Sequence, residues 1–299
     1  MIQKISMKDV CFGPKVVQSL KDTGFAIVTD HGLSKELIDD VYDYWTMFYQ
    51  SPDDFKLKFK YNPAENLQGG FFPFKSENAK DYKVGDLKEF YHFYRSGNLP
   101  IPPVEILGKF DVVNIRASPL NVIALFNAME AVGIKILSEI NNNLPNDVWD
   151  SLSMDLETMA ANSPATLFRS IYYPPIKDND AAEGAVRAAA HEDINLITLL
   201  PAATASGLEV LDTEDKWHSV DTSENDLVIN AGDMLQLASR GYLKSTTHRV
   251  VNTEEGRVAA RFSMPLFIHP WPEVRLSPTK TAAQYLDERL EEIGLKPKK

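Results

Sequence analysis

The sequence predicts a largely helical first half and a second half rich in β-strands, folded as an antiparallel sandwich or jelly roll with flanking helices. From about residue 165, short β-type runs follow one another without intervening helices. Two earlier segments carry helix-capping residues and helical spacing of apolar residues. Internal repeats and Gly/Ser linkers are absent from the 299 residues. We therefore expect one continuous unit, with an N-terminal region (1–160) packed on a β core with a C-terminal helix (161–299).

The first half is predicted to begin with a strand followed by a helix. Residues 24–29 form a short apolar run typical of a buried strand. Ser34 can cap a helix that runs to about Tyr49, and Ser51 and Pro52 then end it. The N-terminal region is thus expected to be of α+β type.

Irregular chain and then a long helix are predicted next. Glycines and prolines interrupt residues 61–118 repeatedly, as in Gly69-Gly70 and Pro102-Pro103. Ser118 and Pro119 form a helix start, with proline at the first helical position. Apolar residues then recur at helical spacing up to residue 140, so this helix should pack on a sheet.

The second half contains short runs of β-forming residues separated by turn residues. These runs cover residues 166–173, 196–200, 208–211, 227–230, 234–238, 246–251 and 258–269. An amphipathic helix is expected over about 281–293.

Composition excludes several classes of partner. The net charge of -11 disfavours a phosphate-binding surface, so nucleic acid is not expected. The N-terminus lacks the long apolar run of a signal peptide, and we expect no membrane-spanning segment. The single cysteine, Cys11, cannot form an internal disulfide. Together these features favour a cytoplasmic protein.

One His-x-Asp pair is a candidate metal site. On a strand, His191 and Asp193 would face the same side while Glu192 points away, and His248 could join them from a neighbouring strand. Two histidines and one carboxylate are typical of non-haem Fe(II) oxygenases. A catalytic zinc site and a non-catalytic, cupin-like metal-binding protein would use the same residue types.

A second pattern predicts an acid-binding site. Arg261 and Ser263 are two apart in an alternating strand, so both face one side. If that side is the interior, Arg261 needs an anionic partner, and the Ser263 and Tyr173 hydroxyls could help to bind a carboxylate. The alternative is an outward Arg261 in a surface ion pair with a nearby glutamate.

Ordered motifs over most of the chain resemble the isopenicillin N synthase-like branch of the Fe(II)/2-oxoglutarate-dependent oxygenases. The matching segments are residues 24–25, 31–33, 88–91, 168–175, 191–193, Trp217, 229–236, 245–250 and 261–265. The resemblance implies a distorted double-stranded β-helix core with Fe(II) bound by His191, Asp193 and His248. It further implies that Arg261 and Ser263 bind the distal carboxylate of 2-oxoglutarate, assisted by Tyr173, and that Gly232-Asp233 forms a tight turn.

The resemblance also implies an enzyme that uses O2 to oxidise a C–H bond while 2-oxoglutarate is decarboxylated to succinate and CO2. Hydroxylation is the simplest outcome; desaturation, ring closure and demethylation would use the same residues, with no separate acid or base. Two departures keep an alternative open. Ile171 stands where many members have asparagine, and some members engage their substrate's own carboxylate with the Arg-x-Ser pair. A 2-oxoglutarate-independent oxidase is therefore the second hypothesis.

The substrate is expected to be a small molecule selected by the irregular part of the first half. Phe71 and Phe72, in an aromatic segment after two glycines, and an inward-facing Arg169 are the candidate substrate contacts. An anionic or amino-acid-like substrate is one option.

Overall fold

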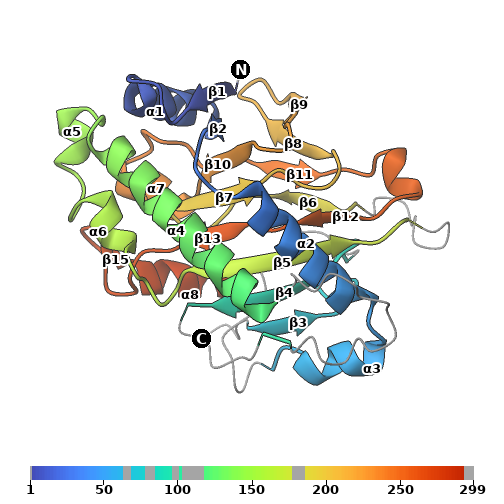
Figure 1. Ribbon diagram of the computed structural model, residues 1–299. Coiled ribbons are helices and arrows are strands. Elements are labelled where there is room, and N and C mark those ends of the chain that lie inside the picture. The colour runs from blue at the N-terminus through green and yellow to red at the C-terminus, as the bar shows by residue number, and fades with distance from the viewer. Residues whose placement is uncertain are drawn as a thin grey trace.

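The computed structural model describes residues 2–62, 69–77, 85–95, 101–102, 118–176 and 186–292. Two β-sheets face each other, and helices cover the outer face of the larger one (Figure 1). This arrangement confirms the predicted jelly-roll core with flanking helices.

Within the described residues, the larger sheet contains nine strands. Their order is β1 (Gln3–Ser6), β2 (Phe25–Thr29), β10 (Leu227–Ala231), β7 (Ile197–Pro201), β13 (Leu266–Ile268), β5 (Leu167–Tyr173), β4 (Glu89–Tyr94) and β3 (Gly70–Phe72), with β12 (Arg261–Ser263) also paired to β5. Among the described strands of this sheet, β1 and β2 pair in parallel and the other pairs are antiparallel.

The smaller sheet positions the histidines. Its order is β6 (Ala188–His191), β11 (His248–Val250), β8 (Leu208–Leu211) and β9 (Trp217–Ser219). Two apolar clusters include side chains from both sheets, one around Tyr173 and Val250 and one around Val210 and Val228. A hairpin of β14 (Arg275–Ser277) and β15 (Lys280–Thr281) precedes α8 (Ala282–Glu292).

Three helices pack over the larger sheet: α1 (Phe12–Thr23), α2 (Lys35–Gln50) and α4 (Pro119–Asn141). As predicted, the Ser34 hydroxyl caps α2 by accepting a hydrogen bond from the Leu37 backbone N–H, and Ser118 caps α4. A Cβ on Gly133 would lie 2.1 Å from the Ile268 side chain, so glycine allows α4 to approach β13 closely. The main core lies at this interface.

The remaining helices of the described residues are short. They are α3 (Asp53–Lys56), α5 (Asn146–Trp149), α6 (Leu156–Ala160), α7 (Asp233–Ala238) and the 3-10 turns η1 (Leu57–Phe59) and η4 (Glu255–Arg257).

Several local predictions were wrong. Residues 234–238 form helix α7 instead of a strand, because Gly232 and Asp233 start a helix instead of a tight turn into a strand. The 258–269 run splits into β12 and β13. Strands β3 and β4 occupy part of the segment expected to be irregular, and β1 and α1 were not predicted.

Helix α4 also differs from the expectation that no segment could span a membrane. By length and composition alone, α4 passes that test within the described chain. In the fold it is a core helix, because its apolar stripe packs on β7 and β13.

Candidate active site

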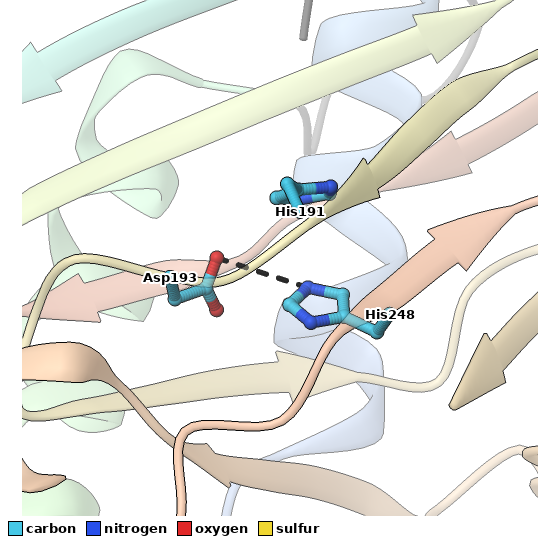
Figure 2. Close-up of side chains that lie close together, drawn as sticks. All are labelled: His191, Asp193 and His248. Carbon is cyan, nitrogen blue, oxygen red and sulfur yellow. Dashed lines mark ion pairs between the residues drawn. The ribbon is translucent and has the colours of Figure 1, made fainter. Parts of the chain in front are cut away.

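Strand pairing brings the two predicted metal-binding histidines together. His248 at the start of β11 lies directly opposite His191 at the end of β6, with ring centroids 4.4 Å apart. Asp193 follows in the loop after β6 and points toward them (Figure 2). The three residues can each offer a ligand atom within 4.8 Å of the other two. The structure therefore brings the three predicted residues together, although Asp193 lies in a loop and not on the strand.

Backbone contacts orient both imidazoles. His191 Nδ1 lies 2.7 Å from the Ala189 carbonyl oxygen, and His248 Nδ1 lies 3.1 Å from that of Thr246. A carbonyl can only accept a hydrogen bond, so each Nδ1 carries a proton, and in the neutral form of either ring Nε2 has the lone pair that can bind a metal. Burial, and then the proximity of His248, lowers the pKa of His191 to about 4. A neutral imidazole is the form that binds a metal.

The Asp193 carboxylate is held by two donors on one oxygen. Its Oδ2 accepts hydrogen bonds from Thr198 Oγ1 at 2.6 Å and Asn230 Nδ2 at 2.8 Å. Although burial opposes ionisation, the nearby histidines and these two donors keep the pKa of Asp193 below its usual value. Oδ1 remains directed at the histidines, 3.8 Å from His248 Nε2. Two imidazole nitrogens and one carboxylate oxygen fit a divalent transition metal such as Fe(II).

Helix α7 fixes the loop that carries Asp193. The backbone N–H of Asp233 donates to the Asp193 carbonyl at 2.8 Å, and that of Gly232 donates to the Leu196 carbonyl at 2.9 Å. A Cβ on Gly232 would lie 2.2 Å from the Asn195 carbonyl oxygen. Glycine at this position therefore permits the helix start to pack against the metal-binding loop.

The predicted acid-binding residues also meet inside the protein. Arg261, Ser263 and Tyr173 are buried, and Arg261 pairs with Tyr173 in register across β12 and β5. The Arg261 guanidinium carbon lies 5.0 Å from the Tyr173 ring centroid. Arg261 thus faces the interior, and the alternative of a surface ion pair is wrong.

Arg261 retains binding capacity. Its Nε donates to the Ala205 carbonyl at 3.1 Å, whereas Nη1 is buried and has no acceptor among the residues that the structure describes. The residue lines a cavity of about 280 Å³, together with Leu200, Leu208 and Val228 among others. Within the described chain Arg261 forms no ion pair, so an acid from outside can supply the missing acceptor.

The predicted substrate residues separate. Strand alternation places Phe72 in the inter-sheet cluster with Tyr173, whereas Phe71 packs in the main core against Phe48 on the helix side. Phe71 is therefore not brought to the site. Arg169 faces inward, which was the condition for naming it as a candidate substrate contact, and its guanidinium carbon lies 4.5 Å from the Phe90 ring centroid.

A charged cluster surrounds Arg169. Its Nε donates to His92 Nε2, and its terminal nitrogens lie 3.4 Å from the Glu77 carboxylate. Lys88 lies 2.7 Å from Glu77 and 2.7 Å from Asp86. Although burial opposes ionisation, the charges of Arg169 and Lys88 hold the pKa of Glu77 far below its usual value. Two cations and two anions therefore balance here.

Sequence reasoning missed several of these contributors. Thr198 carries no signal beyond its place five residues after Asp193, and Asn230 was noted only as part of a family-like motif. Lys88 belongs to another such motif, but Glu77 lies in the segment predicted to be irregular.

Comparison with known proteins agrees with this geometry. Residues 164–270 match the model of the 2OG-Fe(II) oxygenase superfamily, and residues 8–108 match that of the non-haem dioxygenase in morphine synthesis N-terminal region. A 2-oxoglutarate-dependent dioxygenase of Monascus ruber is 30% identical over 281 residues, which cover 89% of this chain and 80% of that protein.

Solved structures share the fold. A crystal structure from Shewanella oneidensis, named only as an oxygenase, is 37% identical with a TM-score of 0.81 and 99% coverage of both chains. A full-length Neurospora crassa protein solved in complex with alpha-KG has a TM-score of 0.77, covering 96% of this chain and 94% of its own; at 22% identity it shows the fold alone. Fe(II) and 2-oxoglutarate are the metal and co-substrate typical of such enzymes. The chain is a 2-oxoglutarate-dependent dioxygenase and belongs to the isopenicillin N synthase-like family of the 2OG-Fe(II) oxygenase superfamily.

Proposed function

We propose that this enzyme oxidises a C–H bond of a small molecule, most simply by hydroxylation, and couples this to conversion of 2-oxoglutarate into succinate and CO2. His191, Asp193 and His248 would hold the Fe(II). Arg261, Ser263 and Tyr173 would bind the distal carboxylate of 2-oxoglutarate. The observation that carries the co-substrate assignment is the buried Arg261, which has an orphaned Nη1 and faces a cavity.

The protein's own groups position the reactants and exclude water. When bound, Fe(II) with 2-oxoglutarate and O2 supplies the oxidising chemistry. Thr198 and Asn230 hold one oxygen of Asp193, so the other stays directed at the metal position. Ile171 lies opposite Ser263 in the strand register and closes this wall with an apolar side chain.

We further propose that the substrate is an uncharged or zwitterionic small molecule, such as an amino-acid-like compound. The balanced charges of Arg169, Lys88, Glu77 and Asp86 would leave no net charge for an anionic substrate to neutralise. A stack of aromatic rings near this cluster, with Phe72 and Phe90 centroids 4.4 Å apart, supplies an apolar wall. The charged side chains would therefore bind the hydrogen-bonding groups of the substrate, and its apolar part would lie against the flat aromatic face.

The test is succinate release from 2-oxoglutarate in air with Fe(II), across a panel of neutral, zwitterionic and anionic small molecules. We expect release to rise with a neutral or zwitterionic compound and to be abolished in His191→Ala. His218→Ala is the matched control, because His218 is an exposed histidine on β9. An anionic compound as the sole stimulator would contradict the substrate class. No release with any compound of the panel would contradict the proposed coupling of small-molecule oxidation to 2-oxoglutarate turnover.

A further inference from the structure

A second arginine is buried beside the acid pocket. Arg187 lies four residues before His191 and is 0% exposed. Its Nη2 donates to the carbonyl oxygens of Gly256 at 3.2 Å and Ala259 at 3.1 Å. Its Nε and Nη1 are buried, and no group in the described part of the chain accepts a hydrogen bond from either. Part of the guanidinium is therefore anchored, and the rest is left without a partner.

The loop around η4 holds Arg187 in place. A Cβ on Gly256 would lie 2.9 Å from the Arg187 guanidinium carbon, so the bare backbone of the loop rests directly on the group. Ala259 is two residues before Arg261. The same segment thus anchors Arg187 and leads into the strand that carries Arg261.

Arg187 and Arg261 lie against the same tyrosine. Their guanidinium carbons are 5.8 and 5.0 Å from the Tyr173 ring centroid. Burial, and then the positive charge of Arg261, lowers the pKa of Arg187. Two cations are therefore close enough to repel each other, although no carboxylate forms an ion pair with either in the part of the chain that the structure describes.

Such an arrangement is unfavourable unless an anion joins it. A buried cation needs a paired charge and acceptors for its N–H groups. Arg187 offers two nitrogens without a hydrogen-bond acceptor, and Arg261 offers one. A carboxylate has two oxygens with about four acceptor positions, and it can therefore accept from both guanidinium groups at once.

We propose that Arg187 is a second arginine of the acid pocket and that it binds the distal carboxylate of 2-oxoglutarate together with Arg261. This inference rests on the proposed co-substrate site and adds a residue to it. A purely structural Arg187 would only tie the η4 loop to β6 through its two backbone contacts.

The test compares two ligands that differ only at the distal end. 2-Oxoglutarate and 2-oxopentanoate share the 2-oxo acid group, but the second has a methyl group in place of the distal carboxylate. Binding is measured by calorimetry without O2, with Mn(II) in the metal site, for the wild-type chain, Arg187→Met and Arg187→Lys. Arg257→Met is the control, because Arg257 also carries a positive charge in the η4 segment but is exposed.

We expect Arg187→Met to weaken 2-oxoglutarate binding at least about tenfold, since a charge-assisted hydrogen bond is lost. Binding of 2-oxopentanoate should stay within about twofold. Arg187→Lys should fall between Arg187→Met and the wild type, and Arg257→Met should bind both ligands normally. Unchanged 2-oxoglutarate affinity in Arg187→Met, as expected if a substrate carboxylate used Arg187 instead, would overturn the proposal. An equal loss for both ligands would overturn it too.

The melting temperature distinguishes a ligand-binding role of Arg187 from a purely structural one. Without ligand, Arg187→Met should melt at the same or a higher temperature, because an unpaired buried charge is removed. A lower melting temperature with unchanged 2-oxoglutarate affinity would show that Arg187 is only an anchor. If the wild-type chain itself fails to bind 2-oxoglutarate with Mn(II), the proposed co-substrate site fails. Binding that persists in Arg187→Met overturns only the role of Arg187.

Discussion

Replacing Thr198 with valine removes one of the two hydrogen bonds that hold the Asp193 carboxylate. The 2.6 Å contact from Thr198 Oγ1 is lost, while the 2.8 Å contact from Asn230 remains. A hydrogen bond to a charged group is worth about 1.5–3 kcal/mol. The contact also stabilises the metal-free protein, so only part of this energy appears in metal binding. Loss of such a partner of a metal ligand typically weakens affinity about 10- to 100-fold.

We expect Thr198→Val to fall near the lower end of that range, about tenfold, because Asn230 still restrains the carboxylate. An oxygen-free titration with Co(II), followed by its visible absorption, measures the change. Thr166→Val is the matched control, because Thr166 is also buried but its hydroxyl has no hydrogen-bond partner in the described part of the chain. Equal Co(II) affinities of Thr198→Val and the wild type would refute the claim that Thr198 positions Asp193.

Three further substitutions test other parts of the molecule. Gly232→Ala should displace the metal-binding loop, because its Cβ would lie 2.2 Å from the Asn195 carbonyl oxygen; a Co(II) affinity equal to that of the wild type would contradict this. Lys56→Met should lower the free energy of unfolding in urea by about 3 kcal/mol, because the Glu89 carboxylate, which Lys56 contacts at 3.0 Å, would be buried without its partner. Burial raises the pKa of Glu89 even beside Lys56, so the double variant Lys56→Met with Glu89→Leu should recover most of the lost free energy of unfolding. A double variant as unstable as Lys56→Met would argue against an unpaired Glu89 carboxylate as the cause. Arg169→Met should reduce substrate-stimulated succinate release at least about tenfold while 2-oxoglutarate affinity stays unchanged. A loss of 2-oxoglutarate affinity would show that Arg169 belongs to the acid pocket and not to the substrate site.

The metal and acid residues could be predicted because short-range chain geometry determines which face they occupy. Arg261 and Ser263 lie two apart on a strand, and both are buried. The His191 and His248 pairing required only neighbouring antiparallel strands. Asp193 lies in the loop after β6 and not on the strand. The alternation of side chains along a strand therefore does not by itself explain why Asp193 faces the histidines.

Long-range packing explains what could not be predicted. Residues 234–238 are apolar enough for a strand, but their helix is set by backbone bonds from its first turn to the loop around Asp193. Phe71 and Phe72 are chemically alike, and only the pairing of β3 with β4 decides which of them faces the inter-sheet space. Arg187 belongs to no sequence motif, because its proposed role depends on proximity to Arg261 and Tyr173, which are distant in sequence.

The most direct test of the two assigned sites is an oxygen-free titration of the Fe(II)-loaded protein with 2-oxoglutarate, followed by the visible charge-transfer absorption of the chelate. The wild-type chain should develop this absorption at saturating 2-oxoglutarate. His191→Ala should fail to develop it, and Arg261→Met should require at least about tenfold more 2-oxoglutarate. Normal absorption in His191→Ala, or an unchanged 2-oxoglutarate requirement in Arg261→Met, would contradict the proposed division between metal centre and acid pocket.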